Sequence, residues 1–145
     1  MSDQIIEDME FYLRYVAGGV KDKGREILEN YEITPPQFVA LQWVSDEMGI
    51  TIGTISSKMH LAHSTTTDMI DRLEKLGVVE RKKDETDRRV VRVYILPEGE
   101  KVIREVIDKR RAYLKDLFHE VDEEELQEFR TLMKHVYEKM SKLTN

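Results

Sequence analysis

Residues 73–99, LEKLGVVERKKDETDRRVVRVYILPEG, place the end of a helix, two strand-like segments and a charged turn in direct succession. Apolar, largely β-branched residues recur at 78–79 and at 91–95, which favours two short strands. The acidic stretch 84–87 between them supplies the turn. We therefore predict a helix that is followed at once by a β-hairpin, the arrangement called a wing.

Charge is concentrated in this hairpin. Residues 81–92 hold six cations and three anions, a net charge of +3, whereas the whole chain carries −6. A basic hairpin on an acidic body indicates that a polyanion binds at one place. The same hairpin can also be a solvated sheet edge whose charges prevent strand pairing.

Composition excludes several classes of protein. A chain of 145 residues suits one domain or half of a shared dimer core, and the absence of cysteine excludes disulfides, thiolate zinc sites and thiol redox sensing. No apolar run approaches the roughly 18 residues that span a bilayer, and the start of the chain lacks a signal-peptide pattern. We expect a cytoplasmic protein without membrane contact.

Helical periodicity and capping signals place the first elements. Residues 3–30 form one amphipathic helix, in which Gly18, Gly19 and Gly24 predict a kink or a close contact. Thr34 and Gln37 enclose two prolines and predict a capping box at the start of a helix over 35–47. The short segment 50–52 that follows is extended and can pair with the hairpin.

A short helix over 52–59, a turn at 60–62 and a longer helix to about residue 76 form a helix-turn-helix pattern. Beyond the hairpin, a helix runs from Pro97 to about residue 118, and Asp122 with Glu125 predicts a second capping box before the last helix. The apolar stripes lie at opposite ends of the chain, which favours intertwining with a second copy over a bundle within one chain.

The predicted fold is mainly α with a small β-hairpin wing. A winged helix-turn-helix DNA-binding lobe occupies residues 34–97. An N-terminal dimerisation helix at 1–33 and C-terminal dimerisation helices at 98–145 flank this lobe and form one intertwined domain.

Three segments carry a resemblance to the MarR family of winged helix-turn-helix transcriptional regulators. They are ITPPQF at 33–38, DRLEKLGVVER at 71–81, and DRR at 87–89 with VYILPEG at 93–99. The resemblance covers essentially the whole chain. It implies a homodimeric repressor that binds double-stranded DNA and is released by a small, often aromatic or phenolic, ligand.

In such a fold the second helix of the motif enters the major groove. Its inward stripe is Thr66, Ile70 and Leu73, so the side chains free to reach DNA are the remaining polar ones: His63, Ser64, Thr65, Thr67, Asp68 and Arg72. Ser64 can either contact DNA or cap the helix. The acid Asp68 departs from the family and can accept a hydrogen bond from cytosine or pair with Arg72.

By resemblance, Arg89 inserts into the minor groove, where narrow A/T-rich DNA concentrates negative potential. Asp87 pairs with an arginine, either Arg81 or Arg89, and keeps the wing rigid. The remaining wing cations, which are phosphate contacts or simply solvated charges, are Lys82, Lys83 and Arg88. Two copies predict a pseudo-palindromic site with half-sites about 34 to 36 Å apart.

The ligand crevice that the resemblance implies has four aromatic candidates, each of which can equally be plain core: Tyr12, Tyr15, Phe38 and Trp43. We expect no cofactor and no metal. A metal-responsive regulator would use His60 with His63, or His119 with the acids at 122–124.

An enzyme is not expected, because the chain lacks a cysteine nucleophile, a phosphate-binding glycine loop and a serine elbow. A winged-helix protein-interaction module that never binds DNA remains a separate alternative. The basic wing distinguishes the two alternatives. Replacing Arg88 and Arg89 by alanine would change DNA binding in a regulator and would leave it unchanged in an interaction module.

Overall fold

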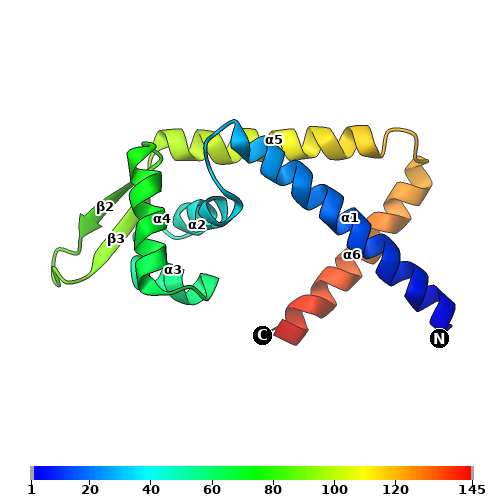
Figure 1. Ribbon diagram of the computed structural model, residues 1–145, viewed down its shortest axis with the longest axis horizontal. Helices are drawn as coiled ribbons and strands as arrows, with labels where there is room; N and C mark the ends of the chain where they lie inside the picture. The colour runs from blue at the N-terminus through cyan, green and yellow to red at the C-terminus, as the bar shows by residue number, and fades with distance from the viewer. Residues whose placement is uncertain (1, 145) are drawn as a thin grey trace. The chain divides into compact units, whose positions relative to one another are not determined.

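The computed structural model describes residues 2–144 and is mainly helical, with one small sheet (Figure 1). Its elements are α1 Asp3–Glu29, α2 Pro35–Asp46, β1 Ile50–Thr51, α3 Ile52–Met59, α4 His63–Lys75, β2 Val79–Lys83, β3 Val91–Ile95, α5 Pro97–Leu117 and α6 Glu123–Thr144. The chain divides into two compact units, up to residue 110 and from residue 111 onward. The first unit holds the helix-turn-helix and the hairpin, so the predicted fold class is confirmed.

Helix α1 runs without interruption through its glycines. A side chain at Gly18 or Gly19 would meet nothing within 4 Å, whereas a Cβ at Gly24 would lie 3.8 Å from Nη2 of Arg110. Of the three glycines, only Gly24 lies near another helix, and even there a side chain would make an ordinary van der Waals contact.

Helix α2 begins at the predicted capping box. The Gln37 backbone N–H donates to Thr34 Oγ1 over 3.3 Å, and the Thr34 backbone N–H donates to Gln37 Oε1 over 3.0 Å. Two N–H groups that a helix start leaves without a helical partner are thereby satisfied. The helix ends one residue before the predicted limit, at Asp46.

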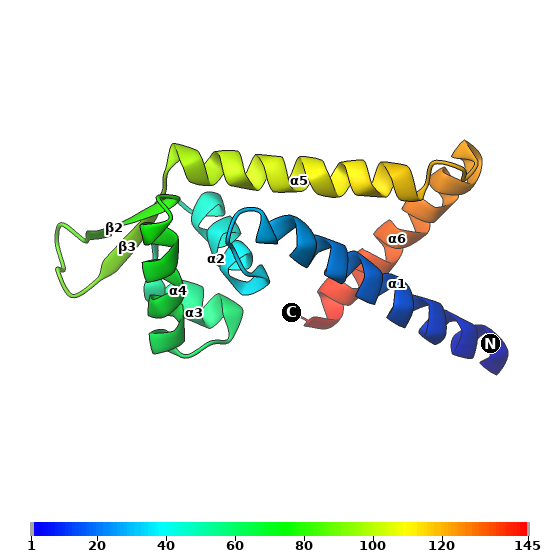
Figure 2. The ribbon, with the colours of Figure 1, turned by 45° about the horizontal axis from the view of Figure 1, so that its top comes forward.

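Helices α3 and α4 are joined by a three-residue turn (Figure 2). His60 adopts the left-handed conformation with φ of 55°, and the Leu61 N–H donates to the Ser56 carbonyl over 3.1 Å, which closes the end of α3. The residue before α4 is Ala62, and no side chain caps this helix. The alternative in which Ser64 is the cap is therefore wrong, because Ser64 lies inside the first turn.

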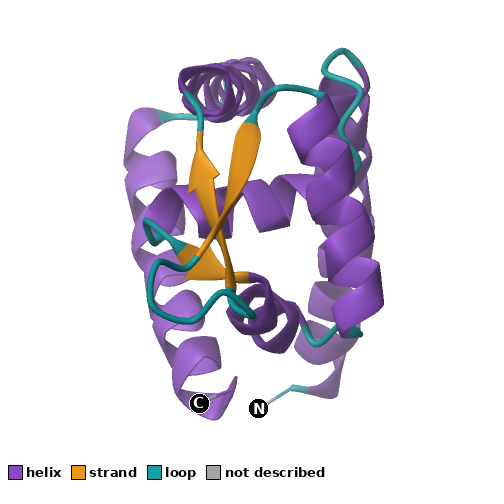
Figure 3. Cartoon of the chain, turned by 90° about the vertical axis from the view of Figure 1, so that its left-hand side faces the viewer, coloured by secondary structure: helices purple, strands orange, loops and turns teal. Residues whose placement is uncertain are grey.

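The sheet has the order β1–β3–β2 and is antiparallel throughout. Ile50 pairs with Val93, so the predicted link before α3 does join the hairpin. Strand β2 continues beyond the β-branched pair at 78–79 as far as Lys83, because Lys82 and Lys83 pair with Arg92 and Val91. Figure 3 views the molecule from the hairpin side and shows β2 and β3 twisted across each other, as expected of a narrow ribbon.

The core lies inside the first unit. Its side chains with 2% exposure or less come from eight elements, and they include Phe38 of α2, Ile55 of α3, Ile70 of α4, Val93 of β3 and Val106 of α5. This shared core fixes α4 against the sheet, which is what positions the candidate site.

Long apolar stripes stay outside this core. On α1 the exposed apolar side chains are Ile5, Ile6, Met9, Phe11, Tyr12, Leu13, Tyr15, Val16 and Val20, and on α6 they are Phe129, Leu132, Met133, Val136, Tyr137, Met140 and Leu143. Among the described residues, no helix is long and apolar enough to cross a membrane.

Candidate nucleic-acid interface

The outer face of α4 is polar and exposed. Thr66, Ile70 and Leu73 are buried, as the inward stripe predicts. Five of the six candidate side chains on this helix are exposed, and Thr67 is half-buried, with its hydroxyl donating to the His63 carbonyl over 3.0 Å. The exposed five are His63, Ser64, Thr65, Asp68 and Arg72.

Asp68 does not pair with Arg72. No ion pair joins the two side chains, although both line a shallow hollow on α4 with Asp71, Lys75 and Leu76. The alternative in which Asp68 pairs with Arg72 is therefore wrong. The Asp68 carboxylate is exposed on the outer face of the helix, where it can accept a hydrogen bond from a base amino group.

Arg81 ties the hairpin to the end of α4. Its Nη2 and Nε donate to Oε1 of Glu74 over 2.9 and 3.2 Å, and its backbone N–H donates to Oε2 over 2.9 Å. Its Nη1 also forms an ion pair with Asp71. The backbone and side-chain hydrogen bonds from Arg81 lower the pKa of Glu74, because they favour its charged form.

A second arginine ties the hairpin to the other side of the lobe. Arg92 Nε donates to Oδ1 of Asp84 over 2.6 Å, and Nη1 donates to the Gly49 carbonyl over 2.9 Å. Gly49 ends the α2–β1 turn with φ of +77°, and a Cβ there would lie 3.2 Å from the Tyr94 hydroxyl. The hairpin thus contacts the turn through Arg92 and Tyr94, two residues of β3 that were not predicted as site residues.

Asp84 organises the turn of the hairpin. Besides Arg92, its carboxylate accepts from the Thr86 hydroxyl over 2.7 Å and from the backbone N–H groups of Thr86 and Asp87 over 3.1 and 2.9 Å. The Arg92 hydrogen bond is the main cause that lowers the pKa of Asp84 well below its usual range. The pattern Asp-x-Thr-Asp is typical of such a turn and could have indicated this role.

Asp87 pairs with Arg89, so the choice between Arg89 and Arg81 is settled. Its Oδ1 accepts from the Arg89 backbone N–H and from Nε, both over 3.1 Å, and its Oδ2 accepts from Nη2 over 3.3 Å. These hydrogen bonds lower the pKa of Asp87. The Arg89 side chain is 92% exposed and stands near the tip of the hairpin.

The other wing cations are also exposed. Lys82 forms an ion pair with Glu80 over 3.2 Å and lies over the Tyr94 ring. Lys83 and Arg88 extend into solvent on the strand end and the loop. Together with Arg89, these cations line one strand end and loop, the positive surface that a phosphate backbone requires.

The four aromatic ligand candidates differ in their surroundings. Phe38 is 1% exposed and belongs to the core, whereas Tyr12 and Tyr15 are 64% and 63% exposed on α1. Trp43 is half-buried, with the Lys58 ammonium 5.1 Å from its ring centroid.

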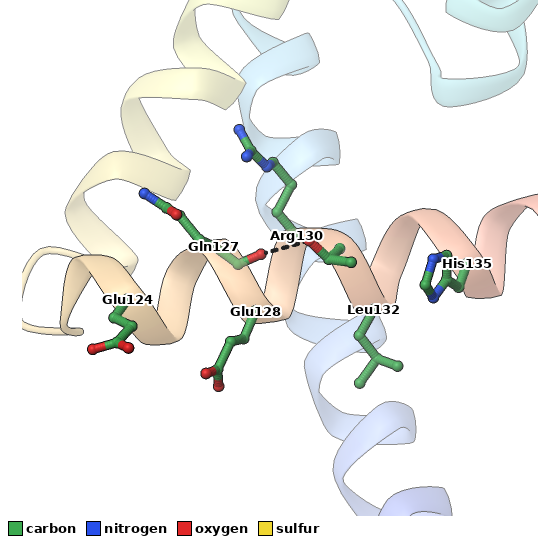
Figure 4. A pocket seen from close by; sticks show the side chains of 7 residues that line it. Glu124, Gln127, Glu128, Arg130, Leu132 and His135 are labelled. Atoms are coloured by element: carbon green, nitrogen blue, oxygen red, sulfur yellow. Dashed lines mark hydrogen bonds between the residues drawn. The ribbon is translucent and has the colours of Figure 1, made fainter.

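A hollow on α6 contains none of these aromatic residues. It is lined by that helix alone, by Glu124, Gln127, Glu128, Arg130, Thr131, Leu132 and His135 (Figure 4). Its one internal hydrogen bond is the ordinary helical contact from the Thr131 hydroxyl to the Gln127 carbonyl over 3.0 Å. Within residues 2–144, no three histidine or acidic side chains are grouped so that they could hold a metal ion.

A helix-turn-helix with a basic hairpin fixed to its second helix defines a winged helix-turn-helix protein. The family model of the MarR family matches residues 33–91. YsmB, an HTH-type transcriptional regulator of Bacillus subtilis, is 54% identical over 134 residues, which are 92% of each chain. The chain therefore belongs to the MarR family.

Other relatives agree. A MarR family protein from Bacillus stearothermophilus has a structure with a TM-score of 0.85 at 45% identity, covering 97% of this chain and 99% of its own. The repressor MdtR of Bacillus subtilis is 26% identical over 86% of this chain and 81% of its own length. A MepR variant from S. aureus, bound to an oligodeoxyribonucleotide, shares the fold with a TM-score of 0.74 at 19% identity, covering 91% and 97% of the two chains. These names indicate a transcriptional regulator.

Proposed function

We propose that the chain is a homodimeric transcriptional repressor that places α4 in the major groove of DNA and the β2–β3 loop in the adjacent minor groove. The observation that carries this proposal is the attachment of the hairpin to α4 on one side and to the α2–β1 turn on the other, through Arg81 and Arg92. An arginine at the tip of a hairpin held in this way keeps a fixed distance from the recognition helix.

The start of α4 suits a phosphate. No side chain caps this helix, so its first N–H groups are available to an anion, and the partial positive charge of the helix end adds to the attraction. Ser64 and Thr65 lie beside those groups and are exposed. Their short hydroxyls can bond either phosphate or base, while Arg72 reaches farther along the groove.

The exposed apolar stripes support a dimer. We assign residues 1–33 and 98–145 to dimerisation and residues 34–97 to DNA binding. Stable homodimers commonly bury more than about 2,000 Å² of largely apolar surface, and both α1 and α6 present such a surface along most of their length. Two lobes related by a two-fold axis would read a pseudo-palindrome in the cytoplasm, where bacterial operators lie.

We further propose that a small aromatic or phenolic ligand releases the DNA. Tyr12 and Tyr15 on α1 and Trp43 on α2 offer exposed or half-exposed ring surface for such a molecule. A ligand that binds more tightly to a form with the two lobes at the wrong separation shifts the population toward that form and lowers DNA affinity.

The test is fluorescence anisotropy with labelled duplex DNA from immediately upstream of the gene, compared with a scrambled duplex, at two salt concentrations. We expect the wild type to prefer the upstream duplex and Arg89→Ala to show a weaker preference. Arg104→Ala removes the same charge from the exposed side of α5 and should bind as the wild type does. A lack of DNA binding even at low salt would contradict the proposal and favour an interaction module.

A further inference from the structure

A pair of hydroxyl groups is buried between α3 and α4. Ser56 Oγ donates to Thr66 Oγ1 over 2.9 Å, and Thr66 Oγ1 donates to the Ala62 carbonyl over 3.2 Å. Thr66 is fully buried and Ser56 is 8% exposed. Among the described residues, Gln37, Ser56 and Thr66 are the buried polar side chains, and the last two are bonded to each other.

This hydroxyl chain, Ser56 to Thr66 to Ala62, is a directional contact between the two helices. The neighbouring contacts come from apolar side chains such as Ile55 and Ile70, which are buried in the same core. Apolar packing depends little on direction, whereas a buried hydrogen bond fixes both a distance and an angle. The hydroxyl chain therefore restrains rotation of α4 about its own axis.

Ser56 also holds the turn. Its carbonyl accepts the Leu61 N–H over 3.1 Å, so one residue of α3 is bonded both to the turn and to the first half of α4. Thr66 lies between Thr65 and Thr67, two of the residues that would meet DNA. Any rotation at Thr66 moves those side chains relative to a groove.

We propose that Ser56 and Thr66 are positioning residues for DNA reading, which set the rotation of α4 and thereby the discrimination between DNA sequences. This inference rests on the proposed function. Neither side chain touches DNA, since both are buried, so their effect passes through the orientation of the exposed face of α4.

The test compares Thr66→Val, which keeps the shape and removes the hydroxyl, with Thr66→Ser, which keeps the hydroxyl. The double variant Ser56→Ala with Thr66→Val removes both partners, so no hydroxyl is left unpaired and stability should return toward the wild-type value. Thr131→Val is the matched control, because Thr131 makes the same bond to the carbonyl four residues earlier and is not part of the apolar stripe of α6 that we assign to the dimer. Each protein is measured for its thermal midpoint and for its Kd on the preferred and the scrambled duplex.

We expect the ratio of the two Kd values to fall about fivefold or more in Thr66→Val, comparable to losing one base-pair contact. The ratio should stay low in the double variant even though its thermal midpoint recovers, and it should be retained in Thr66→Ser and Thr131→Val. This combination separates positioning from stability, because a purely structural role would restore both quantities together.

A wild-type ratio in the folded Thr66→Val protein would overturn the inference, as would recovery of the ratio in the double variant. If Thr66→Val does not fold, the double variant decides alone. If the wild type itself shows no preference between the duplexes, the proposed function fails and this inference fails with it.

Discussion

The guanidinium of Arg81 holds the carboxylate of Glu74 by two side-chain hydrogen bonds, while the Arg81 backbone N–H binds the other carboxylate oxygen. Glu74 lies in the last turn of α4 and Arg81 lies in β2, and between them Gly77 turns the chain with φ of +77°. The base of the wing is therefore attached to the recognition helix by the Arg81–Glu74 contact as well as by the polypeptide backbone.

The planar fork of Arg81 is the feature that this attachment requires. Arg81→Lys keeps the charge but cannot bind Glu74 and Asp71 in the same geometry. We expect a loss of about 1 kcal/mol in the free energy of unfolding, since all three side chains are about one-third exposed and solvent weakens the pair. Urea unfolding of both proteins measures this loss in the free energy of unfolding. Arg25→Lys, with its exposed partner Asp22, should change stability by much less, and equal losses would contradict the argument.

Acid should weaken the same attachment. The pKa of Glu74 is lower in the folded protein than its ordinary value, so its contribution is present above the unfolded pKa and is lost as the pH falls through the folded one. We expect the thermal midpoint of the wild type to exceed that of Glu74→Gln near neutral pH. The difference should shrink below about pH 4, the region where an unfolded glutamate titrates. A difference that does not change with pH would show that the charge of Glu74 is unimportant.

Gly49 and Gly77 offer a matched pair of substitutions. Both have φ of +77°, but a Cβ at Gly77 would meet nothing within 4 Å, whereas one at Gly49 would lie 3.2 to 3.5 Å from the Tyr94 side chain. Alanine at Gly77 should cost about 1 kcal/mol for backbone strain alone. Gly49→Ala should cost more and should also disturb the hairpin, because Tyr94 must move. Denaturant unfolding of both variants tests this, and equal costs would exclude a role for the Tyr94 contact.

Much of the fold follows from local signals. The capping box at Thr34 and Gln37, the stop at Gly77 and the alternating residues of the hairpin each depend on neighbours within a few positions, so the sequence displays them directly. The inward stripe of α4 could also be predicted from helical spacing, and that stripe determined which side chains face outward.

The contacts of the site could be predicted less completely. Some residues have partners far away in the sequence, and others have two candidate partners with the same chemistry. Arg92 binds the carbonyl of Gly49, which lies 43 residues earlier, and a carbonyl has no sequence signature. Asp87 stood near two arginines of equal chemistry, and only the fold shows that Arg81 is committed to α4. Asp68 and Arg72 had the correct helical spacing for an ion pair, but exposed side chains gain little from pairing.

The loop cations Arg88 and Arg89 should differ in what they contribute to DNA binding. Arg88 is exposed without the local pairing of Arg89, which suits a phosphate contact, whereas Asp87 fixes the direction of the Arg89 guanidinium. Removing one phosphate contact from each half of a dimer should reduce the slope of log K against log salt by about 1.8. Arg88→Ala should therefore weaken binding to all duplexes alike and flatten the salt dependence. Arg89→Ala should instead lower the preference for A/T-rich flanks, because a narrow minor groove is what a fixed arginine reads. Anisotropy titrations over a salt series, on duplexes that differ only in their flanks, separate the two effects, and identical behaviour of the two variants would refute the assignment of different roles.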